Sequence, residues 1–418
     1  MKISRLAGVA ALLAAGAAQA QEAIKVNALI EIWYTQMADN NLRLDSAAKP
    51  GGVSTYYDGM SSGRFAENGF TVKRSEVYLS QTISDSISWN LMFDPNNAVN
   101  TTTTLNPVLH DAVITWNLGK GFVLKAGQFK MPTTYEATIV AAKDIYFFDR
   151  NQLNRAFGDK RDRGAWLSYG YGDAKGWQGK LSVAVSNGTT DDGSGGKTAV
   201  DANAQKDFTV RYEGAFGSAH KFGAYYREGV TNLKDSTFAT PTTIPAGLTA
   251  QQIKDNKDKT TLQGAFYVYD TSKWHFDFEY ATGLLGRRFP SLFATAPTGL
   301  SRENLDQKFA GYTGTFIYKM GQHQLALRYD SLNYNSGNNW YTATSPYVVT
   351  VNGAPADYSP KYTETTVGYN YLFVPNKYSV AKLKIDYIMR SKNFLAPRAG
   401  QTGEQGGNSL IASLGIGF

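Results

Sequence analysis

The chain has 418 residues, of which 42% are hydrophobic, 18% charged and 13% aromatic, and it contains no cysteine, which excludes disulfide scaffolds, thiolate metal sites and a catalytic thiol. Its polar overall composition excludes a bundle of membrane-spanning helices, each of which would need about twenty apolar residues in a row. The formal net charge is +7, but the basic residues are dispersed among acidic ones, so nucleic acid is not an expected partner.

The first twenty residues have the features of a secretory signal peptide. Lys2 and Arg5 give a basic start, an apolar run covers residues 6–18, and Ala18-Gln19-Ala20 matches an export cleavage site. We expect residues 1–20 to be removed, which leaves 21–418 as a single domain with a net charge of +5. The alternative, a buried N-terminal helix, is disfavoured because polar residues follow directly.

Residues 21–418 alternate apolar and polar side chains with a period of two, the pattern of β-strands that have one apolar face. Clear examples are 25–35, 274–280, 324–330, 382–390 and 408–418. Short turns alternate with long polar loops. The long loops are 37–68, 94–108, 131–163, 186–206, 229–256, 283–303, 334–361 and 391–405. We estimate about sixteen strands of about ten residues, a length that crosses a membrane when the strand is tilted.

Two all-β architectures have such strands. A soluble sandwich buries the apolar faces between two sheets, whereas a transmembrane barrel turns them to lipid and lines a wet lumen with polar residues. The strict turn and loop alternation, the export signal and the aromatic residues near strand ends favour the barrel. Its closure satisfies every backbone group, so the barrel is one domain. We therefore predict an antiparallel barrel in the bacterial outer membrane.

The segment 109–164 resembles the phosphate-selective porin O and P family. The resemblance rests on Gly127-Gln128-Phe129-Lys130-Met131-Pro132, Glu136, Phe147-Phe148-Asp149-Arg150 and Arg161-Asp162-Arg163-Gly164, with weaker matches at 70–76, 367–371 and the terminal Phe418. The resemblance implies a homotrimeric porin of sixteen strands, whose third long loop folds into the lumen and narrows it. A barrel of this size needs such an internal constriction to be selective.

Anion selectivity requires fixed positive charge beside the path, and arginine suits oxyanions because its planar fork binds two oxygens. Residues 130–163 hold seven basic and five acidic side chains. We expect passive diffusion of small hydrophilic solutes with a bias towards anions such as phosphate. The candidate residues are Arg150, Arg155, Arg163 and Lys130 in or beside the loop, and Lys125, Arg74, Arg211 and Arg227 on lumen-facing strand positions. The alternative is that the same side chains form salt bridges that stiffen the wall and fix the loop.

Two other classes of function remain open. His275, Asp277 and Glu279 share one strand face and resemble part of an enzyme or metal site, but alternate strand residues are about 6.6 Å apart, which is too far for three ligands of one ion. We expect no catalysis, metal or cofactor. A barrel that serves as a scaffold, or as a sleeve around an electron-transfer protein, would need a lumen free of the loop. The position of residues 131–163 therefore discriminates between a sleeve and a pore.

Overall fold

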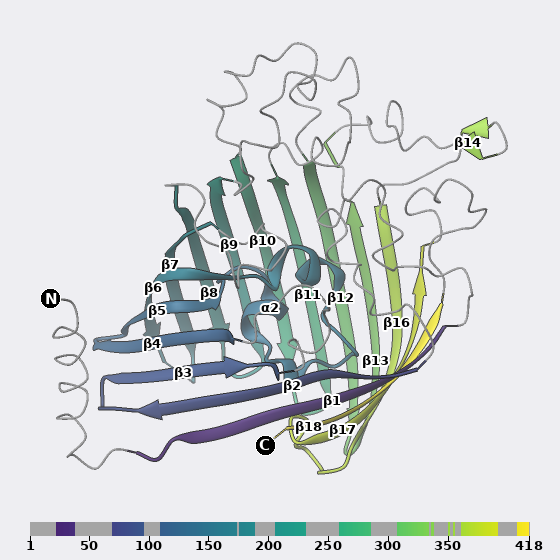
Figure 1. The fold of residues 1–418 in the computed structure, drawn as a ribbon, viewed down its shortest axis with the longest axis horizontal. Coiled ribbons are helices and arrows are strands. Elements are labelled where there is room, and N and C mark those ends of the chain that lie inside the picture. The colour runs from purple at the N-terminus through teal and green to yellow at the C-terminus, as the bar shows by residue number, and fades with distance from the viewer. Residues whose placement is uncertain are drawn as a thin grey trace, which may run out of the picture.

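The computed structural model describes residues 22–37, 69–95, 109–173, 175–188, 205–230, 259–285, 307–333, 336–337, 350–351, 354–355, 361–391 and 408–417. Within these ranges sixteen antiparallel strands form one closed barrel, which confirms the predicted architecture (Figure 1). The expected signal peptide and the terminal Phe418 lie outside the described residues.

The barrel strands follow one another around the wall in chain order. They are β1 Lys25–Met37, β2 Gly69–Thr82, β3 Ile87–Phe93, β4 Leu109–Gly119, β5 Phe122–Lys130, β6 Arg161–Gly172, β7 Trp177–Ser186, β8 Asp207–Phe216, β9 His220–Val230, β10 Lys259–Asp270, β11 Trp274–Leu285, β12 Gln307–Met320, β13 His323–Asn333, β16 Lys361–Leu372, β17 Ala381–Arg390 and β18 Ser409–Gly417. A small hairpin, β14 Thr350–Val351 and β15 Ala354–Pro355, lies between β13 and β16.

The barrel closes where the first strand pairs with the last, for example Ile30 with Ile416. Short turns and long connections alternate along the chain, as predicted. The turn between β4 and β5 has only Lys120 and Gly121 between the strands, with φ values of +51° and +85°. Two-residue hairpin turns require such left-handed backbone because it matches the twist of the flanking strands.

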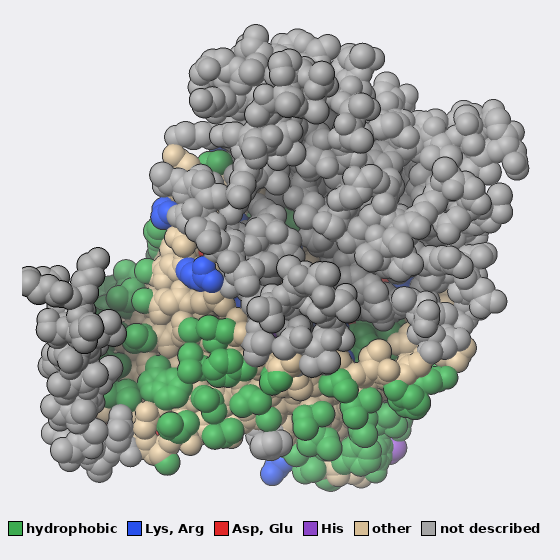
Figure 2. All heavy atoms as spheres, viewed as in Figure 1, with side chains coloured by type: hydrophobic (Ala, Val, Ile, Leu, Met, Phe, Trp, Pro, Cys, Tyr) green, Lys and Arg blue, Asp and Glu red, His purple; other side chains and the backbone are tan. Residues whose placement is uncertain are grey.

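The outward face of the wall is apolar. Outward positions carry exposed large side chains, such as Ile114 on β4, Leu167 on β6 and Leu181 on β7. Figure 2 shows hydrophobic side chains over most of the described wall on the visible face. A soluble protein rarely exposes an apolar surface of this extent, so the face is built for lipid. None of the helices in the described ranges is both long and apolar enough to span a membrane.

The inside of the barrel is only partly polar. Strands β10 to β13 present Phe266, Ile317 and Leu332 to the interior, where these side chains are buried. Gly223 and Gly264 make room for aromatic rings, since a Cβ there would lie 2.5 Å from Phe266 and 2.4 Å from Tyr225. The polar lining of the lumen is thus interrupted in this part of the wall, where apolar side chains of the segment between β5 and β6 pack against it.

Candidate functional site: the lumenal loop and its wall

The segment between β5 and β6, residues 131–160, lies inside the barrel and is named the lumenal loop. It contains three short helical turns, α2 Tyr135–Ile139, η5 Ala142–Asp144 and η6 Asn154–Gly158. Figure 1 shows α2 within the ring of strands. The predicted segment 131–163 was three residues too long, because the β5–β6 register continues through Lys130 with Arg161 and Gln128 with Arg163. Arg163 is thus a strand residue.

An apolar core joins the lumenal loop to the wall. Phe147, Phe148 and Leu153 of the loop are buried in one apolar cluster with side chains of the wall, among them Trp33 on β1 and Phe266 on β10. Phe157 stacks on Phe309 with ring centroids 3.6 Å apart and planes inclined by 6°. Burial of aromatic side chains stabilises a contact by about 2–3 kcal/mol each relative to exposure, so the loop is a packed part of the fold.

Carboxylates of the wall accept hydrogen bonds from the backbone of the loop. The Tyr135 N–H donates to Glu279 Oε1 at 2.8 Å, and the Phe148 N–H donates to Asp386 Oδ2. Glu279 also accepts from Asn154 Nδ2 at 2.8 Å and from the Tyr225 hydroxyl at 2.9 Å. These acids replace the strand partners that an irregular buried backbone lacks.

Cations of β13 and β17 donate hydrogen bonds to carbonyl oxygens of the same loop. Arg328 Nη1 donates to the Asp149 carbonyl at 2.8 Å, and Lys384 Nζ donates to the Phe147 carbonyl at 2.7 Å. Lys382 Nζ reaches the Ile145 carbonyl at 3.3 Å. The loop is therefore tethered to β11, β13 and β17, on the side of the barrel opposite to the strands that begin and end it.

Asp149 of the loop forms ion pairs with two basic side chains of β2. Arg74 Nη2 lies 3.1 Å from Asp149 Oδ1, Lys73 Nζ lies 3.0 Å from Oδ2, and Arg74 also pairs with Glu31. Arg155 Nε lies 3.9 Å from Asp149 Oδ2. Both Arg74 and Arg155 are buried. Two of the candidate arginines thus belong to the attachment of the loop.

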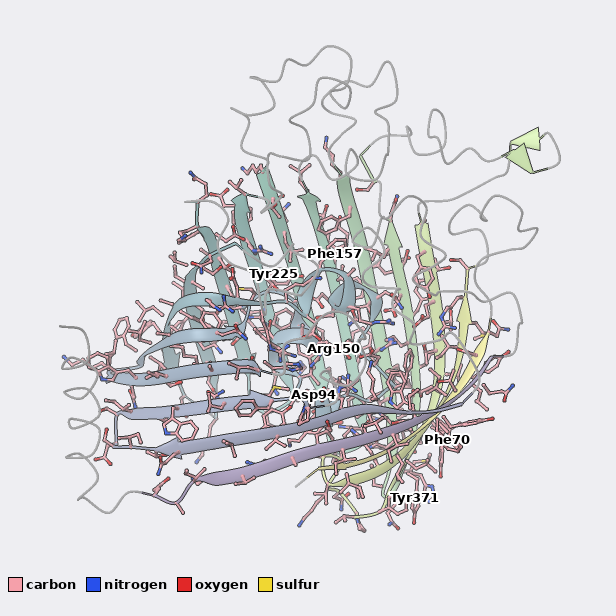
Figure 3. The ribbon with its side chains drawn as sticks, in the orientation of Figure 1. Phe70, Asp94, Arg150, Phe157, Tyr225 and Tyr371 are labelled. Carbon is pink, nitrogen blue, oxygen red and sulfur yellow. The ribbon has the colours of Figure 1, made fainter. Side chains whose placement is uncertain are left out.

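Arg150 holds the loop together from within. Its guanidinium donates to the carbonyls of Val140, at 3.0 Å, and of Glu136, and its Nε lies 3.6 Å from Asp159 Oδ2. The side chain is only 2% exposed and lies in the middle of the barrel (Figure 3). These contacts are those of a structural arginine, because its donors point at loop oxygens.

The pKa values of the two acids beside Arg150, Glu136 and Asp159, shift in opposite directions. Burial raises the pKa of Glu136 to about 7, although Arg328 and Arg150 oppose this rise. Burial acts in the same direction on Asp159, but Lys130, Arg150 and Arg161 outweigh it and hold the pKa of Asp159 well below its ordinary value. Asp159 is therefore ionised near neutral pH, whereas Glu136 is close to its midpoint.

Arg211 on β8 and Arg227 on β9 lie against acids and aromatic rings of the wall. Arg211 Nε donates to Glu213 Oε1 at 2.6 Å, and the guanidinium carbon lies 5.0 Å from the centre of the Phe266 ring. Its side chain is 0% exposed. Arg227 Nε donates to Asp207 Oδ2 at 2.8 Å and is also buried. Neither side chain presents open charge to a passing solute.

Partly exposed cations occur on the wall of β5 to β7. Lys125 Nζ stands 5.0 Å from the centre of the Trp166 ring, and its charged neighbours are Lys180, Glu213 and Asp111. Lys180 pairs with Glu213 and keeps 43% of its side chain exposed. Within the described part of the chain, Lys125 forms no ion pair. We name Lys125, Trp166 and Lys180, on neighbouring strands β5, β6 and β7, the basic wall.

The remaining two candidates are held at the base of the loop. Lys130 Nζ lies 2.8 Å from Asp159 Oδ1, and both side chains are partly exposed. Arg163 Nε donates to Gln128 Oε1 at 3.1 Å, across the β5–β6 pair. The same region holds Arg161, whose Nε lies 2.7 Å from Asp111 Oδ1. The structure thus divides the candidates into side chains that hold the loop, including Lys130, side chains with partners within the wall, and Lys125, which forms no ion pair in the described part of the chain.

His275, Asp277 and Glu279, the suspected enzyme or metal site, do not share one partner. His275 Nε2 lies 2.9 Å from Asp277 Oδ2, whereas Glu279 binds the loop. The described residues contain no group of three or more side chains able to hold a metal ion.

Sequence reasoning gave fixing of the loop as the alternative role of lumen-facing charges, but it did not identify the partners of Glu279, Asp386 and Lys384. Alternation placed these residues on the lumen face, but no local signal shows that their partners are loop backbone groups far away in the chain.

Comparison with known proteins agrees with this geometry. The family model described as phosphate-selective porin O and P matches residues 53–393. Among solved structures, the outer membrane channel DcaP of Acinetobacter baumannii has a TM-score of 0.55 at 12% identity and covers 94% of this chain and 97% of its own. The anion-selective porin from Comamonas acidovorans has a TM-score of 0.50 at 9% identity, covering 95% and 99%.

A trimer form of OmpT of Vibrio cholerae has a TM-score of 0.51 at 11% identity and covers 95% of this chain and 99% of its own. At these identities the structural likeness concerns the fold. The comparison with curated proteins finds no match. The family model spans most of the chain, from β2 to β17. The chain therefore belongs to the phosphate-selective porin O and P family and is an outer-membrane channel of the porin type.

Proposed function

We propose that the protein is a passive diffusion channel biased towards small anions, among them phosphate and related oxyanions, and that the basic wall sets this bias. The channel works without a cofactor or a catalytic step. It reaches the outer membrane after removal of residues 1–20 and assembles there as a homotrimer surrounded by lipid.

The observation that carries the proposal is uncompensated positive charge on the basic wall. Lys180 shares its acid, Glu213, with the buried Arg211, and Lys125 forms no ion pair in the described part of the chain. Low-dielectric walls focus this excess on the narrow path and raise the local concentration of anions. The loop inside the lumen also argues against a sleeve, which needs that space.

The bias is tested by the reversal potential of single channels in a KCl gradient. For the wild type, we expect a reversal potential with the same sign as the equilibrium potential of chloride. For Lys125→Gln, we expect the reversal potential to shift clearly towards zero. The matched control is Lys175→Gln, which removes an exposed lysine from the turn between β6 and β7. A cation-selective wild-type channel would overturn the proposal, and so would equal potentials for Lys125→Gln and the control.

A further inference from the structure

His275, near the start of β11, lies between two carboxylates of the wall. Its Nδ1 lies 3.2 Å from Asp270 Oδ1, and its Nε2 lies 2.9 Å from Asp277 Oδ2. An ionised carboxylate only accepts hydrogen bonds, so both ring nitrogens must be donors, which a neutral imidazole cannot provide. The side chain is only 6% exposed, so water does not replace either acid. The geometry is therefore that of the charged imidazolium.

The ring of His275 also contacts the lumenal loop. The centroid of the Tyr146 ring lies 4.9 Å from that of His275, and the two planes are inclined by 46°. Tyr146 lies equally close to the ring of Tyr378, whose hydroxyl donates to the Ile145 carbonyl at 2.6 Å. A cation near a tyrosine ring is attracted by its π-electrons. The charged form of His275 therefore holds Tyr146 more strongly than the neutral form.

The titratable groups that face His275 or its two acids come from three strands and the loop. They are Asp270 of β10, Asp277 of β11, Lys319 of β12, and Tyr135, Glu136 and Tyr146 of the loop. Lys319 Nζ lies 2.6 Å from Asp270 Oδ1, so Asp270 keeps a cation when His275 is neutral. Within the described ranges, Asp277 has no cation other than His275 at ion-pair distance. The neutral ring therefore keeps its proton on Nε2, towards Asp277.

We propose that His275 is a pH-sensitive contact that fixes residues 140–147 of the lumenal loop to the wall. In the charged form, the ring bridges Asp270 and Asp277 and attracts Tyr146. In the neutral form, Nδ1 and Asp270 Oδ1 are two acceptors that face each other, so one of them turns away and the contact with Tyr146 weakens. Residues 140–147 then become more mobile as pH rises through the titration of His275. This regulation is separate from the anion bias.

The test is the mobility of a nitroxide spin label on the loop, measured by EPR in lipid vesicles at pH 5 and pH 9. The chain has no cysteine, so Lys143→Cys in η5, where the lysine side chain is 46% exposed, gives a single attachment site. Every protein in the series also carries Glu136→Gln, because Glu136, with its pKa of about 7, titrates in the same range. We expect the ratio of mobile to immobile label to rise about two- to fivefold from pH 5 to pH 9, the range that one cation–ring contact supports.

Two variants and one control isolate the contribution of His275. His275→Gln does not titrate, so its label should be as mobile at pH 5 as that of the parent protein at pH 9. Tyr146→Leu removes the ring that the cation attracts and should also abolish the effect of pH. His220→Gln is the matched control and should retain the full effect. His220 also follows a short turn and contacts a tyrosine hydroxyl, that of Tyr267 at 2.8 Å, but it pairs with Phe216 on the outer face.

Equal label mobility at the two pH values in the parent protein would overturn the inference. An effect of pH that survives in His275→Gln would overturn it as well, and Tyr146→Leu decides in the same way if His275→Gln does not fold. The KCl reversal potential, recorded on the same proteins, tests the proposed function independently. A cation-selective channel whose label responds to pH through His275 loses the anion bias and keeps the pH-sensitive contact.

Discussion

At the scale of the residue, the same side-chain type has different roles that depend on its partners. Arg150 spends its donors on loop carbonyls, whereas Lys125 stands over an indole without an ion pair in the described part of the chain. Arg150 lies in the lumenal loop and Lys125 on β5, the strand that leads into it, and sequence reasoning gave both the same candidate role. Their contacts assign Arg150 to the loop, whereas a place for Lys125 on the ion path is part of the proposed function.

Replacement of Arg150 by Met should loosen the loop while changing selectivity little. The change leaves two carbonyl groups and a carboxylate without their cation, at a cost of about 1–3 kcal/mol for each buried group. We expect a larger and noisier single-channel conductance, and faster trypsin cleavage within residues 131–160 of the folded protein. A changed reversal potential with quiet channels would instead place Arg150 on the ion path.

Glu136 makes stability depend on pH. Its pKa of about 7 lies above the value of about 4.5 for an unfolded glutamate, so the folded state binds the proton more tightly. Stability is therefore highest below the unfolded pKa and falls as pH rises from about 4.5 to about 7, with no further loss above that range.

Glu136→Gln should remove this fall in stability with rising pH, because glutamine does not titrate. The variant should match the wild type near pH 4 and exceed its free energy of unfolding by about 1–3 kcal/mol at pH 8. Urea unfolding of the refolded protein in detergent, followed by tryptophan fluorescence, measures the difference. Parallel pH curves for the two proteins would contradict the assignment of this titration to Glu136.

At the scale of the element, the lumenal loop is held by packing as well as by polar tethers. Phe148 is fully buried and touches Trp33 edge-on, with centroids 5.4 Å apart. Truncation of such a side chain usually costs about 3–5 kcal/mol, because it leaves a cavity. We expect Phe148→Ala to lower the thermal midpoint and raise the conductance. Phe216→Ala, on β8 at an exposed position, is the control and should change neither.

Elements were predictable to different degrees for a physical reason. The strands follow from residues two apart, so alternation placed Leu383 and Ile385, or Leu410 and Leu414, on one face without knowledge of their neighbours. The tethers of the loop join residues such as Phe148 and Asp386, which are 238 positions apart. Such pairs depend on the register of many strands, and a single sequence does not encode it locally. The apolar lumen of β10 to β13 was missed for the same reason.

At the scale of the whole molecule, the apolar outer wall and the proposed trimer belong together. A trimer would cover part of the wall of each barrel and leave the rest to lipid. We expect native mass spectrometry of the detergent-solubilised protein to show three copies, which separate into monomers only on strong heating. Monomers under mild detergent at every concentration would remove the trimer from the proposal.

The closure of the barrel by β1 and β18 also sets an order of events during assembly. Glu31 on the first strand binds Lys384 and Ser413, which are synthesised more than 350 residues later. The acids and lysines that hold the loop, from Glu279 to Asp386, likewise follow it in the chain. The loop therefore has no complete binding surface until almost the whole polypeptide is present. Insertion is expected to be late and cooperative, with the last strand completing both the wall and the seat of the loop.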